Sequence, residues 1–407
     1  MSKKQNQYFD NKHPWSVTKD EILRRYLYPY FLKVYPFSWN GIVYVDGFAG
    51  EGIFGDGQKG SPIVAIDQYK SASKGKRKKI QIQFVFGEKD ASRRSELEEN
   101  IATRVGSVGY INKPLLCDSY HEAIEKACSF QFSDKKPSTY FYYLDPFGIK
   151  GLNLDLLCRT PNPAHSEVLL NFNSIGFLRA ACCATNAAHT LIPDDADDEG
   201  MSDLYASESG MEAWLSEAFG GEDWKLVVDE FTNGEMDFWR AEQKISDMYC
   251  ENIRRNYYRY VTCMPVKDMH SSKPSGSLKY RMIHMTNSPD GCIVMNDNML
   301  KINQEMQMMQ TSLFSIDIDS HLLDSDMIAN EMCNAVKSFS IGDEFNMGDA
   351  AAFVVSRCGV SMKVHDLLKN YLAPLIDIGV IDRIEKKTPT GRIKTSFASK
   401  DRIVRLA

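Results

Sequence analysis

Residues 42–52 read Ile42-Val43-Tyr44-Val45-Asp46-Gly47-Phe48-Ala49-Gly50-Glu51-Gly52, in which an apolar strand runs directly into an acidic residue and a glycine-rich turn. Glycines are needed where a backbone passes close to a ligand or takes positive φ angles, because few side chains fit there. The stretch therefore predicts a nucleotide-cofactor site, with the alternative that it is only a tight turn. The expected ligand contacts are Asp46, Gly47, Phe48, Ala49, Gly50 and Gly52.

The position of the acid distinguishes this loop from two common phosphate-binding motifs. A dinucleotide fingerprint has the pattern G-x-G-x-x-G after the strand, whereas here Asp46 precedes the glycines and their spacing differs. A phosphate loop needs a lysine after its last glycine, but Gly60 is followed by Ser61 and Pro62. A carboxylate at the end of a strand suits a ligand with a cationic amino-acid group better than a diphosphate.

The composition indicates a globular protein of more than one domain. The chain has 407 residues, of which 43% are hydrophobic and 25% charged, and this length exceeds that of a usual single core. It has no run of about 18 apolar residues and no apolar signal segment, so we expect a cytoplasmic protein without a membrane partner. The ten cysteines form no C-x-x-C pair, which favours reduced core cysteines and no metal site. The net charge of -6 argues against indiscriminate coating of nucleic acid.

Strand and helix patterns alternate through the first third of the chain. The expected strands cover residues 42–46, 80–87, 110–117, 139–144, 167–172, 260–266 and 279–285. Helices are expected between them, one with Ser61 as its N-cap and Pro62 at its first position. The alternation predicts an α/β fold with a doubly wound, mostly parallel, seven-stranded sheet. Residues 185–245, with the acidic stretch 193–199, interrupt it and are interpreted as a helical insertion.

Acidic residues stand where the first four strands end, at Asp46, Glu88, Asp118 and Asp145. Ligands of doubly wound sheets bind beyond the carboxyl ends of the strands, so one ligand could touch all four. Glu88, which Lys89 follows, is expected to accept hydrogen bonds from two ribose hydroxyls, or else to be an acid at a helix N-terminus. Asp118 and Ser119 are expected to contact an adenine edge, and the alternative that they cap the next helix is nearly as strong.

The tetrapeptide Asp145-Pro146-Phe147-Gly148 follows the fourth strand. Because proline stiffens the turn, Asp145 and a backbone carbonyl can hydrogen-bond an amino group and orient its lone pair. Phe147 can stack on a planar acceptor. Asp145, Pro146 and Phe147 are therefore the candidate catalytic residues.

The pattern changes again near residue 339. Helical segments 347–357 and 364–372 precede a hairpin-like end whose turn is at residues 388–391, flanked by Lys386, Lys387, Arg392 and Lys394. Short helices with a basic hairpin predict a winged-helix module, and the alternative is a small helical tail. We expect a domain at residues 1–310, a helical connector at 311–338 and this module at 339–407.

The glycine loop, Glu88, Asp118 and the Asp-Pro-Phe-Gly turn together resemble the class I, Rossmann-like S-adenosylmethionine-dependent methyltransferases. More closely, residues 15–26, 44–52, 60–62 and 144–148 look like the three-Cys-motif partner family. The resemblance covers about residues 10–300. It implies a methyltransferase-type sheet and S-adenosyl-L-methionine as cofactor, held by the loop, Glu88, Asp118 and Asp145. It also implies a protein partner encoded nearby, a three-Cys-motif protein that resembles radical enzymes.

The methyl acceptor is not implied by this family. The turn at Asp145 also resembles that of tRNA guanine dimethyltransferases and departs from the Asn/Asp-Pro-Pro-Tyr form of DNA adenine methyltransferases. A nucleic acid, RNA or DNA, methylated on an exocyclic amino group is the leading expectation. Its support is the basic run at residues 70–79, the Arg/Tyr cluster at 254–260 and the basic hairpin, each of which could be only a solvated surface. The alternative function is a non-catalytic, cofactor-binding adaptor.

Overall fold

The structure is a computed structural model that describes residues 14–36, 40–106, 108–132, 138–146, 148, 152–185, 210–268, 277–311, 325–359, 362–384 and 399–407. Its internal contacts form two compact units. Unit 1 comprises Met1–Tyr258 and Pro265–Ile283, and unit 2 comprises Arg259–Met264 and His284–Ala407. This division falls within two strands of the sheet described next.

A seven-stranded sheet organises the fold, in the order β3-β2-β1-β4-β5-β7-β6. Its strands are β1 (Ile42–Asp46), β2 (Ile82–Gly87), β3 (Leu115–Cys117), β4 (Thr139–Leu144), β5 (Ser166–Phe172), β6 (Tyr260–Asp268) and β7 (Ser277–Thr286). The pairs among β1 to β5 are all parallel. Only residues 269–276 join the neighbouring strands β6 and β7, which is too short for a parallel crossover, so these two are antiparallel. The predicted α/β class and mostly parallel seven-stranded sheet are confirmed.

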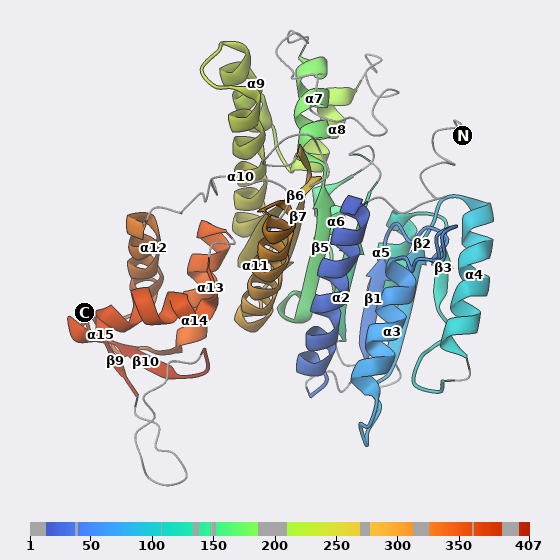
Figure 1. The fold of residues 1–407 in the computed structure, drawn as a ribbon, viewed down its shortest axis with the longest axis horizontal. Coiled ribbons are helices and arrows are strands. Elements are labelled where there is room, and N and C mark those ends of the chain that lie inside the picture. Colours follow the sequence, from blue (N-terminus) through green and yellow to red (C-terminus); the bar gives the residue numbers. More distant parts are fainter. Residues whose placement is uncertain are drawn as a thin grey trace. The chain divides into compact units, whose positions relative to one another are not determined.

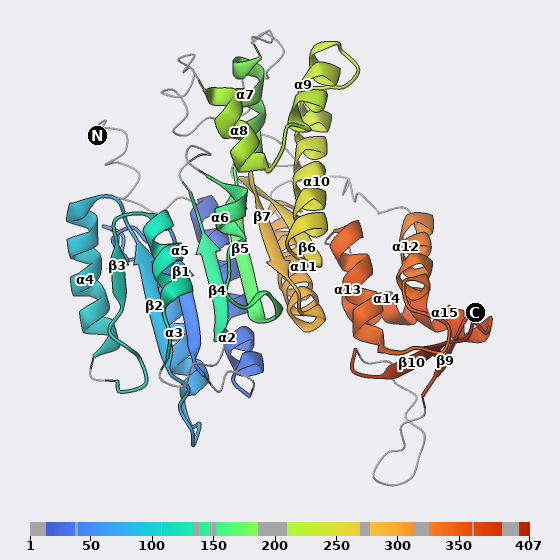
Figure 2. The same ribbon diagram turned by 180° about the vertical axis from the view of Figure 1, so that it is seen from behind.

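Helices cover both faces of this sheet, as a buried parallel sheet requires. They include α2 (Pro14–Val34), α3 (Ser61–Ser73), α4 (Ala91–Val105), α5 (Tyr120–Ser129) and the short α6 (Leu154–Leu157). Figure 1 shows α2 and α3 in front of the sheet, and Figure 2, from behind, shows α5 in front of it. Aromatic side chains fill the α2 face: Tyr30 lies 4.9 Å from Phe141, which stacks on Tyr44 at 5.8 Å.

The insertion after β5 is helical, as expected. It contains α7 (Ser174–Ala184), α8 (Met211–Phe219), α9 (Trp224–Thr232) and α10 (Phe238–Asn256), and the acidic stretch 193–199 lies outside the described residues. Both views show α7, α8 and α9 beyond the edge at which β5 ends. Phe172 of β5 stacks on Tyr249 of α10 with ring centroids 4.3 Å apart, which fixes α10 to the sheet.

Unit 2 has its own core. Its elements are α11 (Pro289–Thr311), α12 (Ser325–Lys337), β8 (Glu344–Asn346), α13 (Met347–Cys358), α14 (Val364–Leu367), a π-helical turn (Leu368–Leu372), α15 (Ala373–Asp377), β9 (Ile381–Arg383) and β10 (Arg402–Arg405). The last three strands form an antiparallel sheet in the order β8-β10-β9. Helix α12, expected as a connector, buries Ile328, Met332 and Val336 in this core. The expected turn at residues 388–391 and its basic flanks lie outside the described residues.

Three local expectations were wrong. Gly60, and not Ser61, is the N-cap of α3, so Ser61 and Pro62 both lie inside the first turn. The third strand is reduced to Leu115–Cys117, because before it only Ile111 pairs with Ile82. The helix expected to end at residue 372 continues to Asp377, because the π-helical turn accommodates Pro374, which cannot donate a backbone hydrogen bond.

Candidate functional site

The carboxyl ends of the first four strands meet through backbone hydrogen bonds. The N–H of Gly47 donates to the carbonyl of Tyr143 at 3.0 Å, and that of Ala49 donates to Gly87 at 2.8 Å. The N–H of Glu88 donates to Cys117 at 3.0 Å. The predicted residues at these strand ends are therefore brought to one edge of the sheet.

Two glycines are required by this convergence. A Cβ at Gly87 would lie 2.8 Å from the carbonyl oxygen of Gly47 and 3.0 Å from that of Ser119, closer than a carbon atom can approach. Gly52 has a φ of +82°, and a Cβ there would lie 2.9 Å from Leu97 Cδ1. The glycine-rich turn is thus both left-handed and closely packed, which is the reason for its composition.

Asp46 lies beneath the loop and is completely buried. Its Oδ1 accepts a hydrogen bond from the N–H of Phe48 at 3.2 Å, while its Oδ2 has no hydrogen-bond partner. Burial raises the pKa of Asp46 to about 7, against the opposing effects of the Ser61 hydroxyl and the Phe48 N–H. The unpartnered oxygen marks Asp46 as an acceptor that a ligand or a water molecule would satisfy.

A cavity of about 60 Å³ lies between the glycine loop and the first turns of α2. The loop contributes the residues from Phe48 to Gly52, with Phe54, Gly60 and Ser61 beside them, and α2 contributes Ser16, Lys19 and Asp20. Asp145 completes the lining. The cavity therefore connects the two strongest sequence signals, the loop after β1 and the turn after β4.

Asp145 is held by two side chains that the sequence did not point to. The Nζ of Lys19 donates to both of its carboxylate oxygens, at 2.8 Å and 2.7 Å, and the Nδ2 of Asn171 donates to Oδ1 at 2.7 Å. The Lys19 ammonium also lies 5.1 Å from the centre of the Tyr280 ring. These groups come from α2, β5 and β7, and their separation in the chain hides the cluster from motif-based analysis.

The remaining predicted contacts lie at the same edge but do not line the cavity. Glu88 is buried, and its Oε1 accepts a hydrogen bond from the N–H of Asp90 at 2.7 Å, while Lys89 is exposed. The Asp118 side chain is 78% exposed and pairs with Arg94 at 3.0 Å. Ser119 is the N-cap of α5, and its side chain accepts a hydrogen bond from the N–H of Glu122, as the alternative interpretation of this residue predicts. Pro146 is buried, and Phe147 lies outside the described residues.

The basic clusters are engaged in local contacts. In the loop between α3 and β2, Lys79 donates to the carbonyl of Ser73, and Lys76 lies over the Tyr35 ring. That loop precedes β2, so it is at the sheet edge opposite the cavity. In the second cluster Tyr258 and Tyr260 are buried, so they cannot stack on a nucleic acid base.

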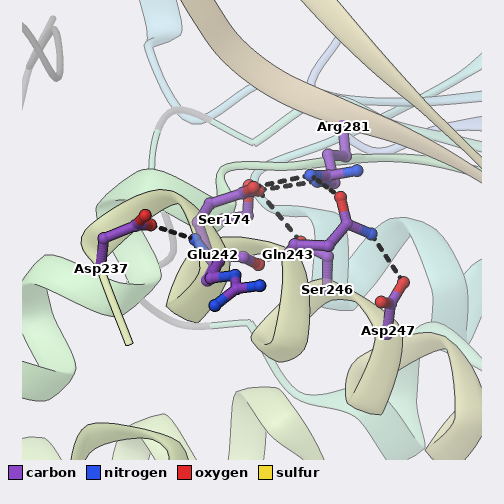
Figure 3. Close-up of polar contacts among 8 residues, drawn as sticks. Ser174, Asp237, Glu242, Gln243, Ser246, Asp247 and Arg281 are labelled. Atoms are coloured by element: carbon purple, nitrogen blue, oxygen red, sulfur yellow. Dashed lines mark hydrogen bonds and ion pairs between the residues drawn. The ribbon is translucent and has the colours of Figure 1, made fainter. Parts of the chain in front are cut away.

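A buried polar network anchors the insertion to the sheet (Figure 3). The carboxylate of Glu242 in α10 pairs with the guanidinium of Arg281 in β7 through two contacts, at 2.7 Å and 2.6 Å. The hydroxyls of Ser174 and Ser246 donate to the same carboxylate. Gln243 accepts from Arg281 and donates to Asp247. Because the polar groups pair with one another, the network serves to join α7, α10 and β7.

Two larger hollows of about 480 Å³ each lie between α4 and β3, away from the strand ends. The lining of the first is apolar except for Glu98 and Lys113, and the second adds Arg94 and Ser95 to these two. Within the described ranges no three His, Cys, Asp or Glu side chains gather as a metal site. Over the same ranges no helix has the length and apolar character needed to cross a membrane.

Sequence signals thus located the glycine loop and Asp145, but missed the contribution of α2 and Asn171. Asn171 is the last residue but one of β5, and a polar side chain inside a buried strand was the one available signal. No family model matches the chain, and no curated protein matches it.

Proposed function

We propose that the protein is an S-adenosylmethionine-dependent methyltransferase that methylates an amino group. The observation that carries the proposal is the cavity shared by the glycine loop after β1 and Asp145 after β4. The strand order, with ligand-accessible loops at the carboxyl ends, supports it. So does the resemblance to the three-Cys-motif partner family in the loop and in the turn at residues 145–148.

The residues present fit the charge of this cofactor. S-adenosylmethionine carries an ammonium, a carboxylate and a sulfonium, and would supply the methyl group when bound. Asp46 offers a buried oxygen without a partner, and Asp20 and Asp145 add two carboxylates at the cavity. Glu88 would accept from the ribose hydroxyls at the next strand end.

In this proposal Asp145 positions the acceptor. Its carboxylate accepts a hydrogen bond from the acceptor's N–H, so that the nitrogen lone pair is directed toward the methyl group. Transfer needs close positioning more than acid–base or metal chemistry. Asn171 holds Asp145 in place, because its amide donates to Oδ1 at 2.7 Å.

Calorimetric titration with S-adenosylmethionine tests the cofactor half of the proposal. We expect binding by the intact protein and a loss of at least about tenfold in affinity in the variant with both Asp46→Ala and Glu88→Ala. Exposed Lys89→Ala serves as the control. Absence of binding by the intact protein, or unchanged binding by the double variant, would contradict it.

We further propose a nucleic acid base as the acceptor and a winged-helix-like role for unit 2. The order of α12, β8, α13, α14 to α15, β9 and β10, with a three-stranded antiparallel sheet, supports this. The sequence between β9 and β10 carries Lys386, Lys387, Arg392 and Lys394, which suit a phosphate backbone. A cytoplasmic location agrees with the ten free cysteines.

A second candidate is a cofactor-binding adaptor without turnover, acting with a neighbouring radical-type enzyme or through nucleic acid binding. The observation that favours it is the occupation of both Asp145 oxygens by Lys19. Incubation of methyl-labelled cofactor with total RNA, DNA and cell protein distinguishes the two. Label in RNA or DNA supports the methyltransferase, and label in none of the three supports the adaptor.

A further inference from the structure

The cavity has the size of a small charged group and not of a whole nucleotide. Its volume of about 60 Å³ is a few times the roughly 10–15 Å³ that a cavity needs to hold one water molecule. It can therefore enclose the amino-acid end of a ligand, while a nucleoside would have to lie outside it. Specificity for that end depends on the few side chains in the lining.

Those side chains carry both signs of charge. Lys19 is the basic residue of the lining, and its side chain is only 7% exposed. The acidic residues of the same lining are Asp20, Glu51 and Asp145. Asp46, two residues before Phe48 in the lining, is buried. A lining with an ammonium among carboxylates is complementary to a group that itself carries a carboxylate and an ammonium.

We propose that Lys19 binds the carboxylate of the ligand's amino-acid end and leaves Asp145 Oδ2 when it does so. This assignment rests on the proposed function and adds to it the residue that binds the carboxylate. The flexible four-carbon stem of lysine allows its ammonium to turn from one acceptor to another. Asn171 keeps its hydrogen bond to Oδ1 meanwhile, so Asp145 stays in position.

One consequence is an order of binding. Lys19 donates to both oxygens of Asp145, and there it competes with an acceptor's amino group. With the cofactor bound, Oδ2 becomes available to that amino group. Lys19 thus couples the cofactor site to the acceptor site.

The test compares S-adenosylmethionine with its decarboxylated analogue, which keeps the sulfonium and the amine. By calorimetry, we expect the wild-type protein to bind S-adenosylmethionine roughly ten- to a hundredfold more tightly than the analogue. In Lys19→Met this preference is lost, because only the affinity for S-adenosylmethionine falls. Lys33→Met, an exposed position on the same helix, keeps the preference.

A second variant covers the case in which Lys19→Met leaves Asp145 unpaired and disturbs the fold. The double variant Lys19→Met with Asp145→Asn removes both charges of the pair, and we expect it also to bind the two ligands equally. If either variant binds S-adenosylmethionine with the preference intact, the inference is overturned and the proposed function stands. If the wild-type protein binds neither ligand, both are overturned.

Discussion

Asp46 is a carboxylic acid with no exposed surface, and its burial raises its pKa to about 7. In the unfolded chain its pKa returns to the ordinary value near 4, so between these values the folded protein binds more protons than the unfolded one. The contribution of Asp46 to stability is therefore present below pH 4 and is lost as the pH rises through 7.

We expect the Asp46→Asn variant to keep the stability that the wild type loses as the pH rises through 7. At pH 8 the free energy of unfolding of Asp46→Asn should exceed that of the wild type by up to about 4 kcal/mol, and at pH 4 the two should be similar. Urea unfolding at the two pH values measures this. Asp118→Asn, whose side chain is 78% exposed, is the control and should follow the wild type. Equal pH dependence of Asp46→Asn and wild type would show that Asp46 is ionised without penalty.

Alanine variants of Gly52 and Gly57 distinguish the cost of backbone strain from the cost of crowding in the loop. Both have positive φ angles, +82° and +80°, but a Cβ meets Leu97 only at Gly52 and nothing within 4 Å at Gly57. Each change to alanine should destabilise the protein by about 1 kcal/mol through φ alone. We expect Gly52→Ala to lower the free energy of unfolding by about 1–3 kcal/mol more, because its Cβ crowds Leu97. Thermal unfolding of the two variants gives the difference, and equal losses would mean that Leu97 yields without strain.

At the scale of elements, regular alternation made the sheet predictable. Strand β1 is an apolar run that ends at the acid Asp46, and Asp145 directly follows β4, so both the fold and the common edge followed from local sequence. The role of helix α2 could not be predicted from local sequence, because Lys19 contacts Asp145, which lies 126 positions later in the chain. The third strand was overestimated because Tyr110 lies in a turn and only an isolated bridge, between Ile111 and Ile82, precedes Leu115–Cys117, which no local pattern reveals.

The Glu242–Arg281 pair should be critical for attachment of the insertion. Glu242→Gln leaves a buried guanidinium without its counter-charge, and we expect a loss of about 3–5 kcal/mol in the free energy of unfolding. Replacing both residues, Glu242→Leu with Arg281→Met, should restore much of it. The control is Glu222→Gln in the exposed pair with Lys225, for which denaturant unfolding should detect no change. A wild-type stability in Glu242→Gln would refute this role of the network.

At the scale of the whole molecule, unit 2 begins within the strands of the sheet. The N–H of Val261 in β6 donates to Ser356 Oγ in α13 at 2.8 Å, and Cys292 and Ile293 of α11 belong to the same core as α12 and α13. The pattern of the sequence changes near residue 339, whereas the contacts of unit 2 also include residues 259–264 and 284–311.

Removal of residues 325–407 should therefore damage what remains. Loss of α12 and α13 uncovers the apolar face of α11 and leaves the N–H of Val261 unpaired. We expect a lower Tm and aggregation on size-exclusion chromatography. A chain cleaved within residues 312–324, with both pieces kept, should elute as one particle. A truncated chain that stays monomeric with an unchanged Tm would indicate that the C-terminal part folds independently.

The ion pair between Lys19 and Asp145 has a consequence for synthesis of the chain. Its partners are 126 residues apart, so at about 5–20 residues per second α2 leaves the ribosome roughly 6–25 s before Asp145 does. During that interval the Tyr30 side chain lacks Phe141, while Tyr69 of α3 is already available to cover Phe31. The apolar face of α2 therefore stays without its sheet contacts during this interval. We expect chaperones to contact the nascent chain first at α2.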